Sequence, residues 1–118
     1  MSDSNALIIT QGNSIVIDIT PIDDDTKEPI RLNDGEKVIF TVKNKLGNLM
    51  IQKILTNEDY DSPEDNGLNC VLDPSDTINF GSGLYLYDCL LITPTEAVTF
   101  ISSTLIVEKA YGKYTDLG

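Results

Sequence analysis

The sequence predicts an all-β fold, an antiparallel sandwich of about seven strands with one short helical turn. Three observations support this prediction. Apolar and polar residues alternate with a period of two in most of the apolar segments, turn-forming residues separate these segments, and only one helix start signal is present. The 118 residues fit a single domain, 1–118, with a core spanning roughly residues 7–110.

The alternating segments are the expected strands. The turn 44–48 is expected to join two of them in a hairpin, and Pro94 suits the turn 94–96 between the last two. We expect a bulge or kink near Ser102 and Ser103. The six expected strands with the clearest pattern are residues 14–20, 36–43, 49–55, 68–72, 83–93 and 98–109.

The single helix signal lies at residues 74–80. Asp73 is a suitable N-cap, Pro74 suits the first helical position and Asp76 places an acid in the first turn. Glycines at 81 and 83 end the segment, so it has room for one or two turns. We expect Ile78 and Phe80 to close one end of the sandwich.

Positions of one parity in each strand form the expected core. Cys70 and Cys89 lie at such positions, so we expect two buried, reduced thiols. Tyr87, two residues before Cys89, is placed like the tyrosine corner of immunoglobulin-type sandwiches. The expected core residues are Ile15, Ile17, Ile19, Val38, Phe40, Val42, Leu68, Cys70, Leu72, Tyr85, Tyr87, Cys89, Leu91, Leu105 and Val107.

Composition argues against several function classes. Eight basic and 19 acidic residues give a net charge of −11, which disfavours binding to nucleic acid or to an anionic membrane surface. The chain has no histidine, so catalytic triads with histidine and the usual zinc sites cannot form. No apolar run is long enough to span a bilayer, and the N-terminus lacks signal-peptide features, so we expect synthesis in the cytoplasm. We therefore expect that the protein is not an enzyme and that it binds no transition metal and no cofactor.

Calcium is a metal ion for which the sequence does contain candidate ligands. Two acidic loops, residues 21–29 and 56–67, contain oxygen ligands of the kind that calcium prefers. The second loop does not match the EF-hand, because Pro63 occupies the third position counted from Asp61. Solvated acidic loops without metal are the simpler interpretation. The candidate ligands are Asp23 to Asp25, Asp59, Asp61, Glu64, Asp65 and Asn66.

Half of the basic residues lie in the expected hairpin 36–55. They are Lys37, Lys43, Lys45 and Lys53, and no acid lies between Glu36 and Glu58. One interpretation is a solvated face of the hairpin. The other is a basic ribbon that pairs with an acidic loop of a neighbouring copy, where charge complementarity would set register more than affinity.

Four short motifs follow one another along residues 10–110. They are Gln11-Gly12-Asn13, Val38-x-Phe40-x-Val42-Lys43, Leu72-x-Pro74-x-Asp76-Thr77 and Gly83-x-Tyr85-x-Tyr87-Asp88. In this order they resemble a family of small immunoglobulin-like β-sandwich proteins from phage tail and baseplate gene clusters, including the N-terminal domain of baseplate upper proteins. The sequence departs from the family pattern at Asn13, where an acid is more usual, and at Ser103, where a glycine is frequent.

The resemblance implies an immunoglobulin-like fold and a non-catalytic structural role in a phage or prophage tail. The protein would be made in the host cytoplasm, reside in the virion, and assemble with its own copies or with other tail proteins. The alternative is a bacterial carbohydrate-binding or adhesin-like sandwich, which would need exposed aromatic rings. Aromatic residues are only 7% of the chain and tryptophan is absent, so the composition favours the tail protein.

The expected interface lies on the strand 83–93. Leu84, Leu86, Leu90 and Ile92 have the parity opposite to the core residues, although the outer face of a half-solvated strand should be polar. Ile39, Val16 and Ile106 are expected to extend this apolar patch, which would mark an interaction site. The alternative is that residues 7–9 fold over the patch within the same chain.

Overall fold

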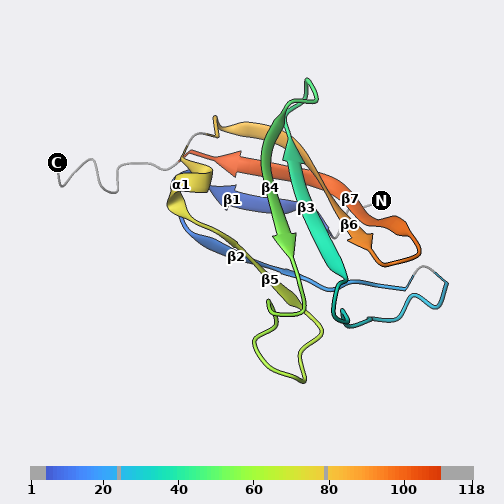
Figure 1. Cartoon of the computed structure of the whole chain (residues 1–118). Helices are drawn as coiled ribbons and strands as arrows, with labels where there is room; N and C mark the ends of the chain where they lie inside the picture. The colour runs from blue at the N-terminus through green and yellow to red at the C-terminus, as the bar shows by residue number, and fades with distance from the viewer. Residues whose placement is uncertain (1–4, 24, 79, 110–118) are drawn as a thin grey trace.

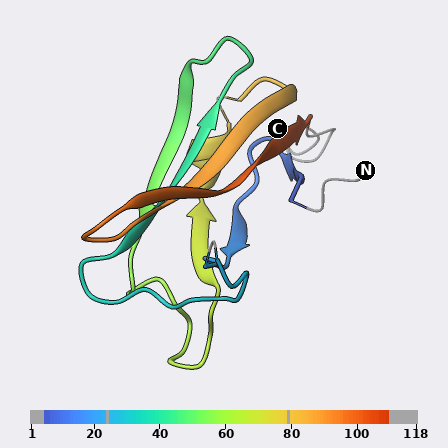
Figure 2. The same ribbon diagram turned by 90° about the vertical axis from the view of Figure 1, so that its right-hand side faces the viewer.

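The computed structural model describes residues 5–23, 25–78 and 80–109. Two β-sheets pack face to face, as predicted (Figures 1 and 2). The larger sheet has five strands in the order β1-β7-β6-β3-β4, and the smaller has β2 and β5. The strands are β1 (Leu7–Thr10), β2 (Ile15–Ile19), β3 (Lys37–Lys43), β4 (Leu49–Leu55), β5 (Leu68–Leu72), β6 (Gly83–Ile92) and β7 (Ala97–Glu108).

The strand order is that of an immunoglobulin-type sandwich. The run β7-β6-β3-β4 corresponds to strands G, F, C and C′, and β2-β5 corresponds to B and E. One pair differs from the antiparallel expectation, because β1 runs parallel to β7, with Ile8 opposite Ile106. The first strand therefore extends the large sheet at its edge. Residues 7–9 do not cover the sheet's outer face, so the alternative in which this segment folds over the patch was wrong.

The core between the sheets contains almost all the expected residues. Fourteen of the 15 expected core residues are buried, and Ile15 is half-buried and packs against them. Ile9, Leu32 and Leu55 belong to the core in addition. Their burial depends on how distant strands pair and on how the loops pack, and the local alternation of apolar and polar residues does not specify either.

The helix α1 (Pro74–Thr77) has a single turn, shorter than the expected 74–80. The backbone N–H of Asp73 donates to Oδ2 of Asp76 at 2.8 Å, which fixes the start of the turn. Phe80 is buried and its ring stacks on Tyr85 with the ring centroids 4.9 Å apart. Ile78 is exposed, so only Phe80 closes this end of the sandwich.

The bulge in β7 lies at Phe100, two residues before the expected position. Cys89 pairs with Ile101 and Leu90 with Thr99, so Phe100 is the extra residue. Phe100 and Ile101 consequently both pack against the core, although they are neighbours in sequence.

Candidate functional site

The candidate site is the outer face of the five-stranded sheet, which is the face turned away from β2 and β5. Strand register arranges its residues in cross-strand rows. A first apolar row joins Ile8, Ile106 and Leu84, with Leu86 two residues further along β6. A second apolar row joins Leu90, Ile39 and Ile54, with Ile92 two residues further along β6. The predicted interface residues therefore do lie on one face.

Exposure of these side chains is uneven. Ile8 is 59% exposed, Leu86 49% and Ile54 58%, whereas Leu90, Ile92 and Ile39 are half-buried. Ile8 and Ile54 were not expected from the sequence. Their membership depends on which strands occupy the sheet edges, and the local pattern carries no signal for that.

Val16 was expected to extend the patch, and this was wrong. It lies on β2 in the other sheet, where it pairs with Val71. Strand parity identifies the face of a strand on which a side chain lies, but it does not identify the sheet to which the strand belongs. Val16 and Val71 form a separate, smaller pair of exposed aliphatic residues.

A polar band separates the two apolar rows. It consists of Ser102, Asp88, Thr41 and Gln52, which lie opposite one another on β7, β6, β3 and β4. Gln52 Nε2 donates to Thr41 Oγ1 at 3.2 Å, and Thr41 is buried. The outer face is thus apolar at both ends and hydrogen-bonding in its middle.

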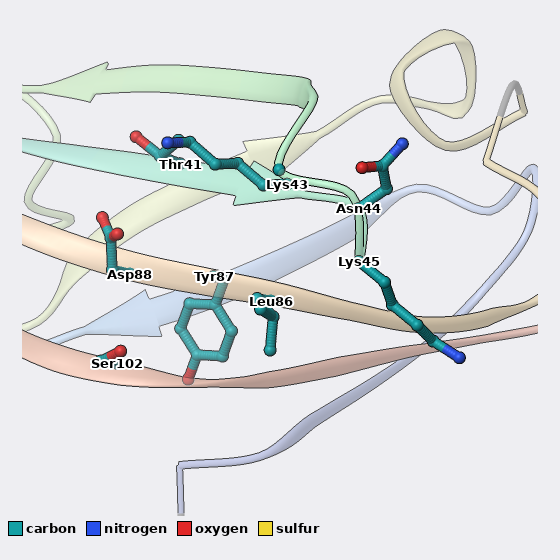
Figure 3. Close-up of a pocket in the computed structure, with 9 residues that line it drawn as sticks. Thr41, Lys43, Asn44, Lys45, Leu86, Tyr87, Asp88 and Ser102 are labelled. Atoms are coloured by element: carbon teal, nitrogen blue, oxygen red, sulfur yellow. The ribbon is translucent and has the colours of Figure 1, made fainter.

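A groove of about 220 Å³ opens beside this band, lined by residues from β3, β6, β7 and the β3–β4 turn. Figure 3 shows the Lys43 side chain extending along β3 toward Thr41, while Lys45 extends away from it. Leu86 and Asp88 contribute from β6. The groove is smaller than the roughly 300–1,000 Å³ of typical small-molecule sites, so it suits a side chain of a partner better than a free ligand.

The basic residues of the hairpin do not act as one ribbon. Lys53 faces the other side of the sheet, where its Nζ lies 2.9 Å from Oδ2 of Asp76. Lys37 and Lys43 lie at opposite ends of β3. Within the described part of the chain, Lys53 is therefore paired internally, and Lys43 and Lys45 remain together at the tip of the hairpin.

The acidic loops use several of their carboxylates for local hydrogen bonds. Asp59 Oδ2 accepts from the backbone N–H of Thr56 at 2.8 Å, and Asp61 Oδ1 accepts from Asn69 Nδ2 at 2.7 Å. Among the described residues, no group of three or more acidic or cysteine side chains is arranged to hold a metal ion. Nothing in this part of the chain therefore supports the calcium interpretation; Asp24, one of the candidate ligands, lies outside the described residues.

The two cysteines are free and buried, as predicted. Burial raises the pKa of the Cys70 and Cys89 thiols to about 12 each. A thiol with such a pKa is protonated near neutral pH and is a poor nucleophile. Cys70 and Cys89 therefore behave as small core side chains.

The aromatic rings of the described residues lie in the core or are half-buried. Phe40, Phe80, Tyr85 and Tyr87 are buried, and Phe100 is half-buried. Tyr60 is half-buried under the guanidinium of Arg31, whose carbon lies 3.9 Å from the ring centroid. A platform for sugar stacking needs exposed rings, so these rings do not favour the carbohydrate-binding alternative.

The motif Gln11-Gly12-Asn13 lies against the end of the motif Leu72-x-Pro74-x-Asp76-Thr77. Gln11 Nε2 donates to the Phe80 carbonyl at 2.7 Å, and the Gly12 N–H donates to Thr77 Oγ1 at 2.9 Å. Thr77 Oγ1 in turn donates to the Asn13 carbonyl at 3.0 Å. These motif residues therefore join the β1–β2 turn to α1, which is a structural task.

The expected tyrosine corner is formed by a different tyrosine. Tyr85 Oη donates to the carbonyl of Gly81 at 2.8 Å, four residues upstream, which is the contact typical of the corner. Tyr87 Oη instead donates to the carbonyl of Asn5, near the start of the chain. The assignment of the corner to Tyr87 was therefore wrong.

Comparisons with known proteins add no family assignment. The sequence matches no family model and no curated protein. Among the described residues there is also no helix with the length and apolar character needed to cross a bilayer.

Proposed function

We propose that this protein is a non-catalytic structural module of a phage or prophage tail, and that it assembles through the outer face of its five-stranded sheet. The observation that carries the proposal is the pair of exposed apolar rows on that face, which no segment of the described chain covers. Exposed apolar patches on small proteins mark interaction sites. The tail and baseplate location rests on the resemblance of the four ordered motifs and is the finer part of the proposal.

The occupant of the outer face is a second copy of the chain. Burying one fully exposed leucine side chain is worth about 1.5–3 kcal/mol, so covering the exposed parts of the two apolar rows favours the association of two sheets. A two-fold contact brings the same face of both copies together and closes on itself. The polar band then lies within the contact and constrains its register by hydrogen bonding.

Light scattering during size-exclusion chromatography tests this contact. The unmodified chain should elute as an oligomer, and the Leu86→Asp, Leu90→Asp double variant should be folded and monomeric. The matched control is Val16→Asp with Val71→Asp, which changes two exposed aliphatic residues on the other sheet and should leave the mass of the oligomer unchanged. A monomeric unmodified chain at high concentration would refute assembly through the outer face.

The tail location has its own test. Mass spectrometry of purified tail particles from the host strain should detect this chain at a constant ratio to the other tail proteins. Its absence from particles that are otherwise complete would contradict the phage role and leave the assembly property standing alone.

A further inference from the structure

The tip of the β3–β4 hairpin presents one apolar side chain on a rigid support. Leu46 is 86% exposed. The turn beneath it is held by Asn44, whose Oδ1 accepts from the backbone N–H groups of Leu46 and Asn48, at 2.9 Å each. Gly47 supplies the positive φ of 89° that the turn requires. Because the turn is ordered in advance, little conformational entropy is lost when Leu46 contacts a partner.

The same tip is a local positive region on an anionic protein. Lys43 and Lys45 flank Asn44, and no acidic residue lies between Glu36 and Glu58 in the sequence. In the described part of the chain neither Lys43 nor Lys45 forms an ion pair. The tip therefore offers an apolar side chain with the Lys45 ammonium group near it, while the Lys43 side chain starts at the base of the tip and extends along β3 toward Thr41 (Figure 3).

A pocket of complementary character lies at the other end of the sheet. It has a volume of about 190 Å³, too small for a typical small-molecule ligand, which needs roughly 300–1,000 Å³. Asp23 and Glu96 contribute carboxylates to its lining. Its apolar lining consists of Ile22, Ile30, Leu91, Val98 and Phe100.

Acidic residues surround this pocket. Hydrogen bonds from the backbone N–H groups of Thr26 and Asp25 hold the pKa of Asp23 below its usual value of 3.8. Glu96 is exposed in the β6–β7 turn, and Asp25 and Glu28 are exposed in the loop 21–30. Lys27 is the only cation of that loop between Asp23 and Glu28. The pocket thus joins an apolar interior to an acidic surround.

The tip and the pocket cannot meet within one molecule. Lys43, at one end of β3, leads into the tip, and Lys37, at the other end, pairs with Ile92, which leads into the turn beside the pocket. Seven strand residues separate the two ends by about 20 Å. Figure 1 shows the hairpin tip at the top, and the β6–β7 turn and the loop 21–30 at the lower right.

We infer that the Leu46 side chain of one copy inserts into the pocket between Ile22 and Phe100 of a second copy, with Lys45 facing Asp23 and Glu96. This contact joins two different surfaces, so it is head-to-tail and can be repeated by each further copy. It rests on the proposed assembly role and extends it, because the outer-face contact closes a pair and the tip contact links one pair to the next. A contact made by one leucine and a few exposed charges is small and therefore transient in dilute solution.

Site-directed cross-linking detects such a transient contact. The full chain is prepared as Asn48→Cys and, with ¹⁵N labelling, as Thr95→Cys, two exposed positions beside Leu46 and beside the pocket that leave Leu46 and Ile22 in place. The two are mixed and treated with a short bis-maleimide. The native thiols do not compete, because Cys70 and Cys89 are fully buried. Intact mass separates mixed-isotope dimers from dimers of a single variant. Mixed dimers should dominate.

Two matched variants set the background. Val71→Cys replaces Thr95→Cys as a measure of random collision, since Val71 is exposed on the other sheet. Adding Lys45→Glu to Asn48→Cys should lower the yield of mixed dimer several-fold, because opposed charges become like charges. A mixed yield no higher than that with Val71→Cys, or a majority of dimers between two Asn48→Cys chains, overturns the inference.

The cross-linking result can be distinguished from the light-scattering result that tests the proposed function. The outer-face contact is measured by light scattering on chains without introduced cysteines, and the tip contact by cross-linking. An oligomer in light scattering without the cross-link retains the outer face and removes the tip contact. A cross-link with a monomer in light scattering retains the tip contact and removes the outer face.

Discussion

The backbone N–H of Gly12 donates a hydrogen bond to the hydroxyl oxygen of Thr77, with 2.9 Å between nitrogen and oxygen. The two residues are 65 positions apart, and Thr77 is fully buried. The same hydroxyl donates to the carbonyl of Asn13. One side chain thus satisfies two backbone groups of the β1–β2 turn and fixes the turn against α1.

Replacing Thr77 by valine should destabilise the fold by about 1–3 kcal/mol, because the Gly12 N–H and the Asn13 carbonyl lose their partner while the shape of the side chain is kept. Urea unfolding measures the change. Ser75→Ala is the matched control, since Ser75 is exposed on the same helical turn and should have a small effect. Equal stability of the two variants would contradict a structural role for the Gly12–Thr77 hydrogen bond.

Cys70 and Cys89 should resist alkylation in the folded protein. Their pKa values of about 12 lie above the ordinary value of 9.0, because burial disfavours the thiolate. Iodoacetamide at pH 8 should add no mass to the native chain and two adducts in guanidinium chloride. Rapid labelling of the native chain, or a disulfide in an untreated sample, would contradict burial of the two free thiols.

The same thiols predict a loss of stability in alkali. A thiol whose pKa is raised by folding keeps its proton in the native state, so its contribution is complete below pH 9 and declines as the pH rises toward 12. Replacing both cysteines by alanine should flatten this part of the stability profile, measured by urea unfolding from pH 8 to 11. An unchanged slope in the double variant would show that other groups govern it.

Asp76 predicts a loss of stability in acid. The N–H of Asp73 and the ammonium of Lys53 hold the pKa of Asp76 below its usual value of 3.8. A carboxyl group with a lowered pKa stabilises the fold above its unfolded pKa and loses that contribution as the pH falls through the folded value. Between pH 5 and 3 the unfolding free energy of the unmodified chain should therefore fall more steeply than that of Asp76→Asn. Parallel profiles would contradict this.

Alternation alone predicts most of the fold because the two faces of β3 and of β5 differ in polarity, whereas β6 is apolar on both faces. It fails where a residue's environment depends on pairing far along the chain. Phe100 and Ile101 both point inward because a bulge inserts one residue, and Ile8 reaches the outer face because β1 pairs in parallel with β7. Val16 shows the related limit, since parity carries no information on which sheet a strand joins.

The candidate site likewise contains residues that the pattern of one strand predicts and residues whose position depends on pairing far along the chain. Leu84, Leu86 and Leu90 could be assigned to one face from the strand 83–92 alone. The pocket lined by Ile22, Leu91 and Phe100 could not be predicted in this way, because these residues come from a loop and two strands. Lys53 is a further example: it lies on an inward parity, and its ion pair with Asp76 depends on where α1 packs.

Tyr85 lies near the start of β6 and is buried. Its hydroxyl donates to the Gly81 carbonyl at 2.8 Å and its ring stacks on Phe80, so it ties the segment after α1 to the start of β6. Tyr85→Phe keeps the ring and removes one hydrogen bond, so it should cost about 0.5–1.5 kcal/mol and lower the Tm by roughly 2–8 °C. Tyr85→Leu removes the ring stack as well and should cost more.

Neither Tyr85 variant should change assembly, because the Tyr85 side chain faces the core while its neighbours Leu84 and Leu86 face outward. Light scattering below the Tm should therefore give the same mass for both variants as for the unmodified chain. This separates the two faces of β6: the inner one determines stability and the outer one determines association. A Tyr85→Phe variant that is as stable as the unmodified chain would contradict the first assignment, and one that is folded but monomeric would contradict the second.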